Sequence, residues 1–299
     1  MRSSTKRSAA ALQRPRKMSD ATFTPSAFIA SFEMIPEAFL QNTYPAVANA
    51  LSRPVYLLAV MYVAWYGYAV YDGRAASSPK DLLVRLLTVT LVLGTLSWGG
   101  FASQLYHMAI ELMNGVGGTI ISGQPVSSTL DGVMAQCGKI TNVMLSAGLS
   151  NIGIVILGVL IYGVTEVFLI LASVYIVISK IMLAIVFLLL PLVIASVFWP
   201  TTRQWFMNWA SMVLNAVFIY ILTFAVLKFG FQFADTYFQK AQGLTGLDAA
   251  SLTFSQIAFV IPTFGVLFLF LLQVKGWAAS LSGGAVVQSL SLINRLRGR

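Results

Sequence analysis

The sequence has few charged residues, a single cysteine and a single histidine. Charged side chains make up 10% of the 299 residues, whereas a soluble globular domain carries about 25%. So few charges cannot cover the surface of a soluble protein of this size. Cys137 stands alone, which excludes a disulfide framework within the chain. His107 has no ligand-like spacing around it, so neither a metal site nor a Ser/His or Cys/His catalytic centre is expected.

Apolar side chains take the place of the missing charges. They make up 58% of the residues, and the mean hydropathy of the chain is +0.80. Because a transmembrane helix needs about 20 consecutive apolar residues, the runs in this chain predict an all-α, polytopic transmembrane protein with about five to six spans. The sequence holds no G-x-x-x-x-G-K-[ST] phosphate-binding loop. We therefore expect no nucleotide hydrolysis. Because the predicted spans carry no paired acids or His cluster, we also expect no enzyme activity, no cofactor and no metal.

The apolar runs and the stretches between them predict five successive parts. These are an N-terminal tail with an amphipathic segment (1–50), the first two transmembrane helices (51–100), a Gly-rich central loop with short helices (101–151), a C-terminal transmembrane bundle (152–284) and a basic C-terminal tail (285–299). Met18 is an alternative start of the protein, because the residues before it are basic and lack an apolar period.

The longest apolar run extends from Ile152 to Trp199. It is more than twice the length that one span requires, so we expect two helices joined by a tight turn. Lys180 is expected to mark a polar helix end near that turn, and Pro191 to kink the second helix, which neighbouring helices can tolerate. Further spans are predicted over residues 54–71, 82–100, 210–231 and 254–274.

The basic residues predict how the chain crosses the membrane. The short turn that carries Arg74, Lys80 and Arg85 is expected to face the cytoplasm, since cytoplasmic loops are rich in Lys and Arg. The 101–151 loop then falls outside. The basic residues before Met18 contradict this arrangement unless translation starts at that methionine. Five spans would leave the C-terminal tail inside and six would leave it outside, and the sequence does not decide between them.

A basic and aromatic collar follows the longest run. Arg203, Trp205 and Trp209 stand where one predicted helix leaves the bilayer and the next one enters it. Indole rings favour the headgroup zone and Arg can reach lipid phosphates, so the collar fits a lipid-anchoring belt. The two tryptophans are four residues apart and would share one face of a helix. The collar therefore also fits a contact surface for a neighbouring subunit.

Glu166 lies inside an apolar stretch, IYGVTEVFLILA, where a charged side chain costs about 2.5 to 3.5 kcal/mol. It is expected either to line a conduit or carry a proton, or to form a structural contact. Its possible partners are Lys180, Lys228 and Arg85. A secondary transporter of a small solute, with Glu166 as its coupling carboxylate, is the alternative function. The paired broken helices that transporters commonly show in two related halves are not evident here.

Small residues follow the last predicted span. The segment ASLSGGA places Ala279 four residues before Gly283, and Ser280 four before Gly284. Small residues at this spacing let helix backbones approach closely. The same composition also fits a flexible exit from the span, and the sequence leaves both interpretations open.

Taken in order, these features resemble a known family. The stretch SKIMLAIVFLLLPLVIASVFWPTTRQWFMNWASMVLNAV, followed by GWAASLSGGA, is similar to the TrbL-type family of polytopic inner-membrane channel subunits of bacterial type IV secretion systems. That family shows a Lys-led apolar helix with a Pro, an Arg-bearing turn, a Trp, and a late segment ending in Gly-Gly. The matching positions are Lys180, Pro191, Arg203, Trp209 and residues 278–284, within a similar layout over 51–284.

The resemblance implies a structural and channel component in the inner membrane of a Gram-negative bacterium, with the 101–151 loop in the periplasm. Such a component would help to translocate DNA or protein and to build the pilus. The implied partners are other secretion subunits, namely the minor pilus subunit, pilin, inner-membrane complex proteins and ATPases. A homo-oligomer, membrane lipid and transient contact with the DNA or protein substrate are also expected.

Overall fold

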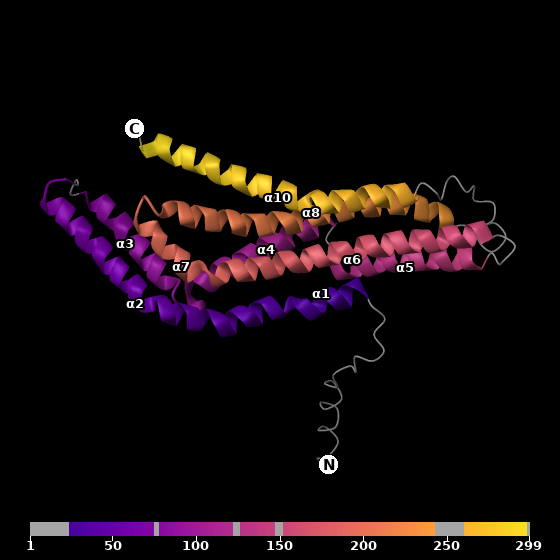
Figure 1. Cartoon of the computed structure of the whole chain (residues 1–299), viewed down its shortest axis with the longest axis horizontal. Coiled ribbons are helices and arrows are strands. Elements are labelled where there is room, and N and C mark those ends of the chain that lie inside the picture. The colour runs from indigo at the N-terminus through magenta and orange to yellow at the C-terminus, as the bar shows by residue number, and fades with distance from the viewer. Residues whose placement is uncertain (1–23, 75–77, 122–125, 147–151, 243–259, 298–299) are drawn as a thin grey trace, which may run out of the picture.

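The computed structural model describes residues 24–74, 78–121, 126–146, 152–242 and 260–297, and in these ranges it contains helices and turns but no strands (Figure 1). The long helices are α1 (Pro25–Glu33), α2 (Ile35–Tyr71), α3 (Pro79–Gly94), α4 (Ser103–Ile120), α5 (Val126–Leu145), α6 (Ile152–Leu188), α8 (Arg203–Gln242) and α10 (Val260–Arg297). Shorter elements are η1 (Trp98–Ala102), α7 (Leu190–Ile194) and η3 (Ala195–Phe198).

The helices confirm the prediction of an all-α, polytopic membrane protein. Four helical stretches in the described ranges are long and apolar enough to cross a membrane, and one bent pair of helices can supply a fifth span. The four stretches are Pro25–Tyr71, Val155–Leu188, Arg203–Phe233 and Ile261–Gly283, and the bent pair is Pro79–Gly94 with Trp98–Ile120. The described residues thus supply five spans at most, the lower of the two expected numbers.

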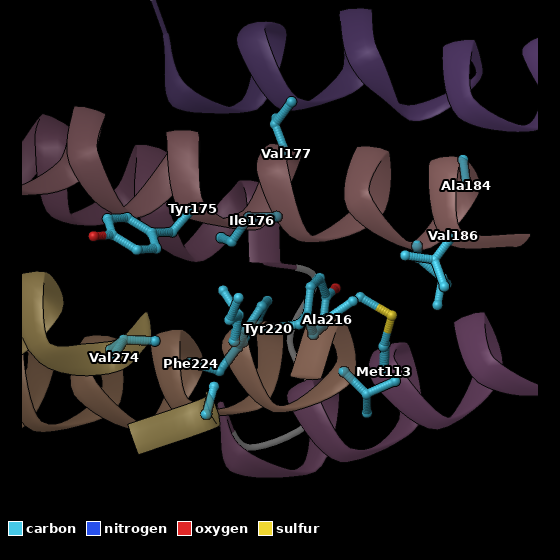
Figure 2. Close-up of a cluster of buried hydrophobic side chains, with 14 of the residues drawn as sticks. Met113, Tyr175, Ile176, Val177, Ala184, Val186, Ala216, Tyr220, Phe224 and Val274 are labelled. Atoms are coloured by element: carbon cyan, nitrogen blue, oxygen red, sulfur yellow. The ribbon is translucent and has the colours of Figure 1, made fainter. Parts of the chain in front are cut away.

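The core of the bundle forms around α6, which packs against α5 and α8, while α8 packs along α10. Figure 2 shows where four of the helices meet. Ile176 of α6 lies near Tyr220 and Phe224 of α8, with Met113 of α4 and Val274 of α10 beside them. All five side chains are buried. Many large apolar side chains also remain exposed on the outside of the bundle, which suits a protein surrounded by lipid.

The longest apolar run differs from the prediction. In place of two helices and a tight turn, Ile152–Leu188 forms one 37-residue helix, α6, about 55 Å long. Neither Gly nor Pro occurs between Val164 and Leu188 to interrupt it. Pro191 lies in the first turn of α7, where a missing backbone N–H costs little, so it marks a helix start and does not kink a span. Lys180 therefore lies inside α6 and not at a turn.

The N-terminal helices are longer than the sequence predicts. The predicted amphipathic segment and the predicted span over 54–71 belong to one almost continuous helical stretch, formed by α1 and α2. Figure 1 shows that α2 bends along its length. Pro45 and Pro54 lie inside α2, and prolines bend helices because each removes a backbone hydrogen bond. The basic tail and the alternative start at Met18 lie outside the described residues.

The second predicted span contains a sharp break. The axes of α3 and of the helix that begins at Trp98 differ by 94°. Two glycines allow the chain to fold closely at this point. A Cβ atom on Gly94 would run into the ring of Phe101, and one on Gly100 would run into the Gly94 carbonyl oxygen. The pair of helices is therefore a broken span or a re-entrant loop.

The central segment is more helical than the sequence predicts. In place of a loop with short helices, it contains α4 and α5, of 18 and 20 residues. α4 packs against α8, and α5 packs against α1 and α6. Gly117, one of the glycines of this segment, is a packing position within α4. A Cβ atom there would lie 3.0 Å from the ring of Tyr220, so the small residue lets α4 and α8 approach closely.

Candidate functional site

Polar side chains from four helices form a series of contacts across the bundle, in which Lys180 and Tyr220 are buried and Glu33 and Asn114 are exposed. Lys180 of α6 is 7% exposed, and its Nζ donates a hydrogen bond of 2.8 Å to Oε1 of Glu33, the last residue of α1. The same Nζ lies 5.9 Å from the ring centre of Tyr220 on α8, within range of a cation–π contact. The Tyr220 hydroxyl donates a hydrogen bond of 3.0 Å to Oδ1 of Asn114 on α4. Glu33, Lys180, Tyr220 and Asn114 are called the cross-bundle polar chain below.

The two charges of this chain differ in their exposure. The side chain of Glu33 is 57% exposed, whereas that of Lys180 is enclosed by neighbouring helices. An ammonium group taken out of water loses its hydration energy and needs a close partner to compensate. Lys180 therefore depends on Glu33 more than Glu33 depends on Lys180. A buried ionisable residue in a membrane bundle is a candidate functional site because it is costly to place there.

α1 is held across the bundle by carboxylates at both of its ends. At its N-terminus, Oδ1 of Asp131 on α5 accepts a hydrogen bond of 3.1 Å from the backbone N–H of Ser26, and negative charge is favourable at a helix N-terminus. At its C-terminus, Glu33 is held by Lys180 of α6. α1 therefore forms a strap that ties α5 and α6 together.

The structure places Trp209, one of the predicted collar residues, inside the core. It is 8% exposed, and its indole Nε1 donates a hydrogen bond of 2.7 Å to the carbonyl oxygen of Val186 on α6. Its ring packs edge-on against Phe187 and stacks with Phe206, at centroid distances of 5.4 and 5.5 Å. In this structure Trp209 joins α8 to α6 and is not open to a neighbouring subunit.

Trp205 and Arg203 remain accessible. The side chain of Trp205 is 66% exposed, and Arg203, the first residue of α8, is partly exposed. Trp205 and Trp209 diverge because four residues turn a helix by about 400°, or about 40° beyond a full turn. That difference is enough to place one ring in the core and the other on the surface. The structure therefore does not bring the predicted collar together on one face.

Glu166 of α6 is partly buried, and the ion pairs found among the described residues do not include it. Two of its predicted partners are engaged elsewhere. Lys180 is paired with Glu33, and the guanidinium of Arg85 lies 4.1 Å from the ring centre of Tyr66. Within the described ranges, no group of three His, Cys, Asp or Glu side chains could hold a metal ion. Glu166 is therefore not a member of the cross-bundle polar chain.

Gly283 and Gly284 lie within α10, which continues as a helix to Arg297, so the segment is not a flexible exit from the last span. Gly283 is exposed, and nothing lies within 4 Å of the position that a Cβ atom would take. The small residues that do turn inward are Ala278 and Ser282, which are also four apart and are buried. The face that carries Gly283 therefore leaves room for another helix.

Of the cross-bundle polar chain, only Lys180 is a candidate from the sequence, and the other three members are not predicted. Glu33 is separated from Lys180 by 147 positions, and Asn114 from Tyr220 by 106. Pairs so far apart leave no spacing pattern in a single sequence. The available signal is that Glu33 is one of two acids, with Glu37, in an otherwise mostly apolar stretch.

Comparisons with known proteins extend this description. Residues 59–274 match the family described as TrbL/VirB6 plasmid conjugal transfer protein. The chain is also similar to the type IV secretion system protein VirB6 of Bartonella henselae, with 25% identity over 211 residues. It is 24% identical over 212 residues to the VirB6 protein of Bartonella quintana. Each match covers 69% of this chain and 65% of the relative, so the chain spans slightly less than two thirds of the length of these relatives.

Proposed function

The chain belongs to the TrbL/VirB6 family of plasmid conjugal transfer proteins, and from this premise we propose that it is a channel component of a type IV secretion system. In this role it helps to move DNA or protein across the cell envelope and to assemble the pilus. The family match over 59–274 carries the proposal. The helices that can cross a membrane support it, since a conduit subunit must be anchored in the bilayer.

The proposed site of action is the inner membrane of a Gram-negative cell, with the chain crossing it several times. The proposed partners are the minor pilus subunit, pilin, the other inner-membrane proteins of the machine and its ATPases, together with further copies of this chain. The ATPases supply the energy, and this subunit has a structural role without catalysis. Transient contact with the transported DNA or protein follows from a position beside the conduit.

Three parts of the structure suit this role. Trp205 and Arg203 present an exposed aromatic ring and a cation at the start of α8, and such residues are favoured anchors for a neighbouring subunit. The open face of α10 at Gly283 has room for a second helix. Glu166, as a partly buried acid on α6, is the proposed polar position near the conduit.

Deletion of the gene in its host tests the proposal. We expect loss of both pilus formation and substrate transfer, with both restored by a copy of the full chain. A second copy that starts at Met18 tests whether the preceding residues are needed. Unchanged transfer, together with a growth defect on one solute, would overturn the proposal and favour a secondary transporter that uses Glu166.

The subunit-contact residues need a separate test. Trp205→Ala is expected to leave membrane insertion and folding unchanged, because the ring is exposed, and to reduce co-purification with the other secretion subunits and substrate transfer. Trp65→Ala on α2 is a matched control, since Trp65 is similarly exposed at 69%. Equal effects of the two variants would assign both rings to lipid contact and remove Trp205 from the proposed interface.

A further inference from the structure

An apolar groove lies beside the break in the second span. Ser52, Arg53, Tyr56 and Leu57 of α2 form one side, and Leu96, in the break between α3 and η1, forms the other. The groove has a volume of about 430 Å³. Its surface is almost entirely apolar, and Arg53 is the single charged residue that lines it. A groove of this kind matches a ligand with a long apolar part and one negative group.

Arg53 stands at the depth where phospholipid headgroups are expected. The apolar stretch 54–71 that follows it has 18 residues and is about 27 Å long as a helix, close to the thickness of about 30 Å of a hydrocarbon core. The ion pair between Asp72 and Arg74 closes the opposite end of this stretch. One end of the span therefore carries a paired arginine, and the other carries Arg53.

Arg53 is exposed and takes part in no ion pair or cation–π contact found among the described residues. The neighbouring Ser52 hydroxyl already donates its hydrogen bond to the backbone oxygen of Asn49 at 2.8 Å. The guanidinium is therefore the main donor available at this end of the groove. A guanidinium binds phosphate oxygens through two parallel hydrogen bonds, which gives a phosphate group a geometric fit as well as an opposite charge.

The same side of α2 continues as an apolar stripe away from Arg53. Tyr56, Leu57, Val60 and Met61 follow it at the spacing of one helix face, and all four are exposed. An acyl chain attached to a phosphate at Arg53 can lie along this stripe towards the middle of the bilayer. The charged end of the groove therefore matches the headgroup of a phospholipid, and the apolar stripe matches its acyl chain.

We propose that this groove binds one anionic phospholipid, with its phosphate on Arg53 and an acyl chain along Tyr56, Leu57 and Leu96. Such a lipid links α2 to the break between α3 and η1, because the groove has walls from both. The inference rests on the geometry of α2 and Leu96 and is independent of the proposed role in secretion.

The test uses the full chain purified in detergent, with lipid binding counted by native mass spectrometry. Dioleoyl phosphatidylglycerol is titrated against wild type, Arg53→Gln, Arg53→Lys and the control Arg74→Gln. We expect Arg53→Gln to weaken the tightest binding step about fivefold, the effect of one basic residue near an anionic membrane surface. Arg53→Lys should bind with an affinity between those of wild type and Arg53→Gln, since it keeps the charge but cannot form the two parallel hydrogen bonds. Arg74→Gln should leave it unchanged, since Arg74 is paired with Asp72 outside the groove.

Two further arms identify the source of the phosphate. Dihexanoyl phosphatidylglycerol should bind more weakly than the dioleoyl lipid, and millimolar inorganic phosphate should not displace the lipid, because the apolar groove contributes to binding. The proposal is overturned if Arg53→Gln binds like wild type or if Arg74→Gln loses as much affinity. It is also overturned if inorganic phosphate competes with the lipid, which would indicate a simple anion site. Circular dichroism of each variant shows that loss of binding is not loss of fold.

Discussion

Removing one member of the Glu33–Lys180 pair is expected to have very different consequences from removing the other. Lys180 is 7% exposed and Glu33 is 57% exposed. Glu33→Gln leaves a buried ammonium group without a counter-charge. Lys180→Met removes the buried charge, replaces it with an apolar side chain of similar length, and leaves a carboxylate whose side chain is 57% exposed. The lysine therefore relies on the pair and the glutamate does not.

The magnitudes follow from the exposure of the two groups. Breaking a fully buried ion pair by removing one partner costs about 3 to 5 kcal/mol. Because the Glu33 side chain is exposed, the attraction between its carboxylate and Lys180 is screened by the surroundings. We therefore expect Glu33→Gln to lower the free energy of unfolding by about 2 kcal/mol. Lys180→Met should cost less than about 1 kcal/mol, since the methionine fills the same space without a charge. The double variant should match Lys180→Met, which gives a coupling energy of about 2 kcal/mol.

Unfolding in mixed detergent micelles with rising sodium dodecyl sulfate, followed by circular dichroism, measures these free energies. Glu37→Gln is the control, because Glu37 is an exposed acid whose contact with His107 is 3.9 Å long, so its loss should cost less than about 0.5 kcal/mol. Equal costs for Glu33→Gln and Lys180→Met that add in the double variant would refute the reasoning. That result would mean that Lys180 does not depend on Glu33 for its stability.

Three further predictions concern single positions. Trp209→Phe should lower the free energy of unfolding by about 1 to 2 kcal/mol in the same assay, because the buried carbonyl of Val186 loses its indole donor. If Trp209→Phe lowers the free energy of unfolding no more than Trp205→Phe does, this prediction is wrong. Gly100→Ala should disturb the break between α3 and η1, because its Cβ atom would meet the backbone oxygen of Gly94. Limited proteolysis should then cut the variant near residue 100. The exposed control Gly99→Ala should be cut like wild type. Cys137 is buried, and burial raises the pKa of its thiol to about 12, so maleimide should not label it between pH 7 and 9 until the protein is unfolded; rapid labelling of the folded chain would show that α5 detaches from α6.

The sequence predicts the helices well because their apolar length is a local property. The runs around 210–231 and 254–274 become the spans within α8 and α10, with ends that differ by several residues. The rule that one span needs about 20 residues sets a minimum length and gives no maximum. For that reason it divides the run from Ile152 to Trp199 into two spans of similar length, although neither Gly nor Pro stops α6 between Val164 and Leu188.

The contacts of the candidate site could not be predicted in the same way. Trp205 and Trp209 have the spacing of one helix face, and only the position of α6 beside α8 decides that the second ring is buried. Lys180 is visible in the sequence as an isolated charge, but Glu33 reaches it only because α1 folds back across α6. Residues 101–151 are rich in glycine, and Gly117 becomes a packing position only once Tyr220 lies opposite it.

The length of α6 limits how this protein can sit in a bilayer. Transmembrane helices tilt by up to about 40° from the membrane normal, and a 55 Å helix at that angle still covers about 42 Å of depth. A hydrocarbon core of about 30 Å leaves at least about 12 Å of depth, or roughly ten residues along the tilted axis, beyond the acyl chains. α5 packs along α6, with the Thr141 hydroxyl 3.5 Å from the Gly158 carbonyl oxygen, and is not itself among the candidate spans. Where α6 extends beyond the hydrocarbon core on the side of α5, it is packed against that second helix. A partner on that side would contact a pair of packed helices and not a single mobile one.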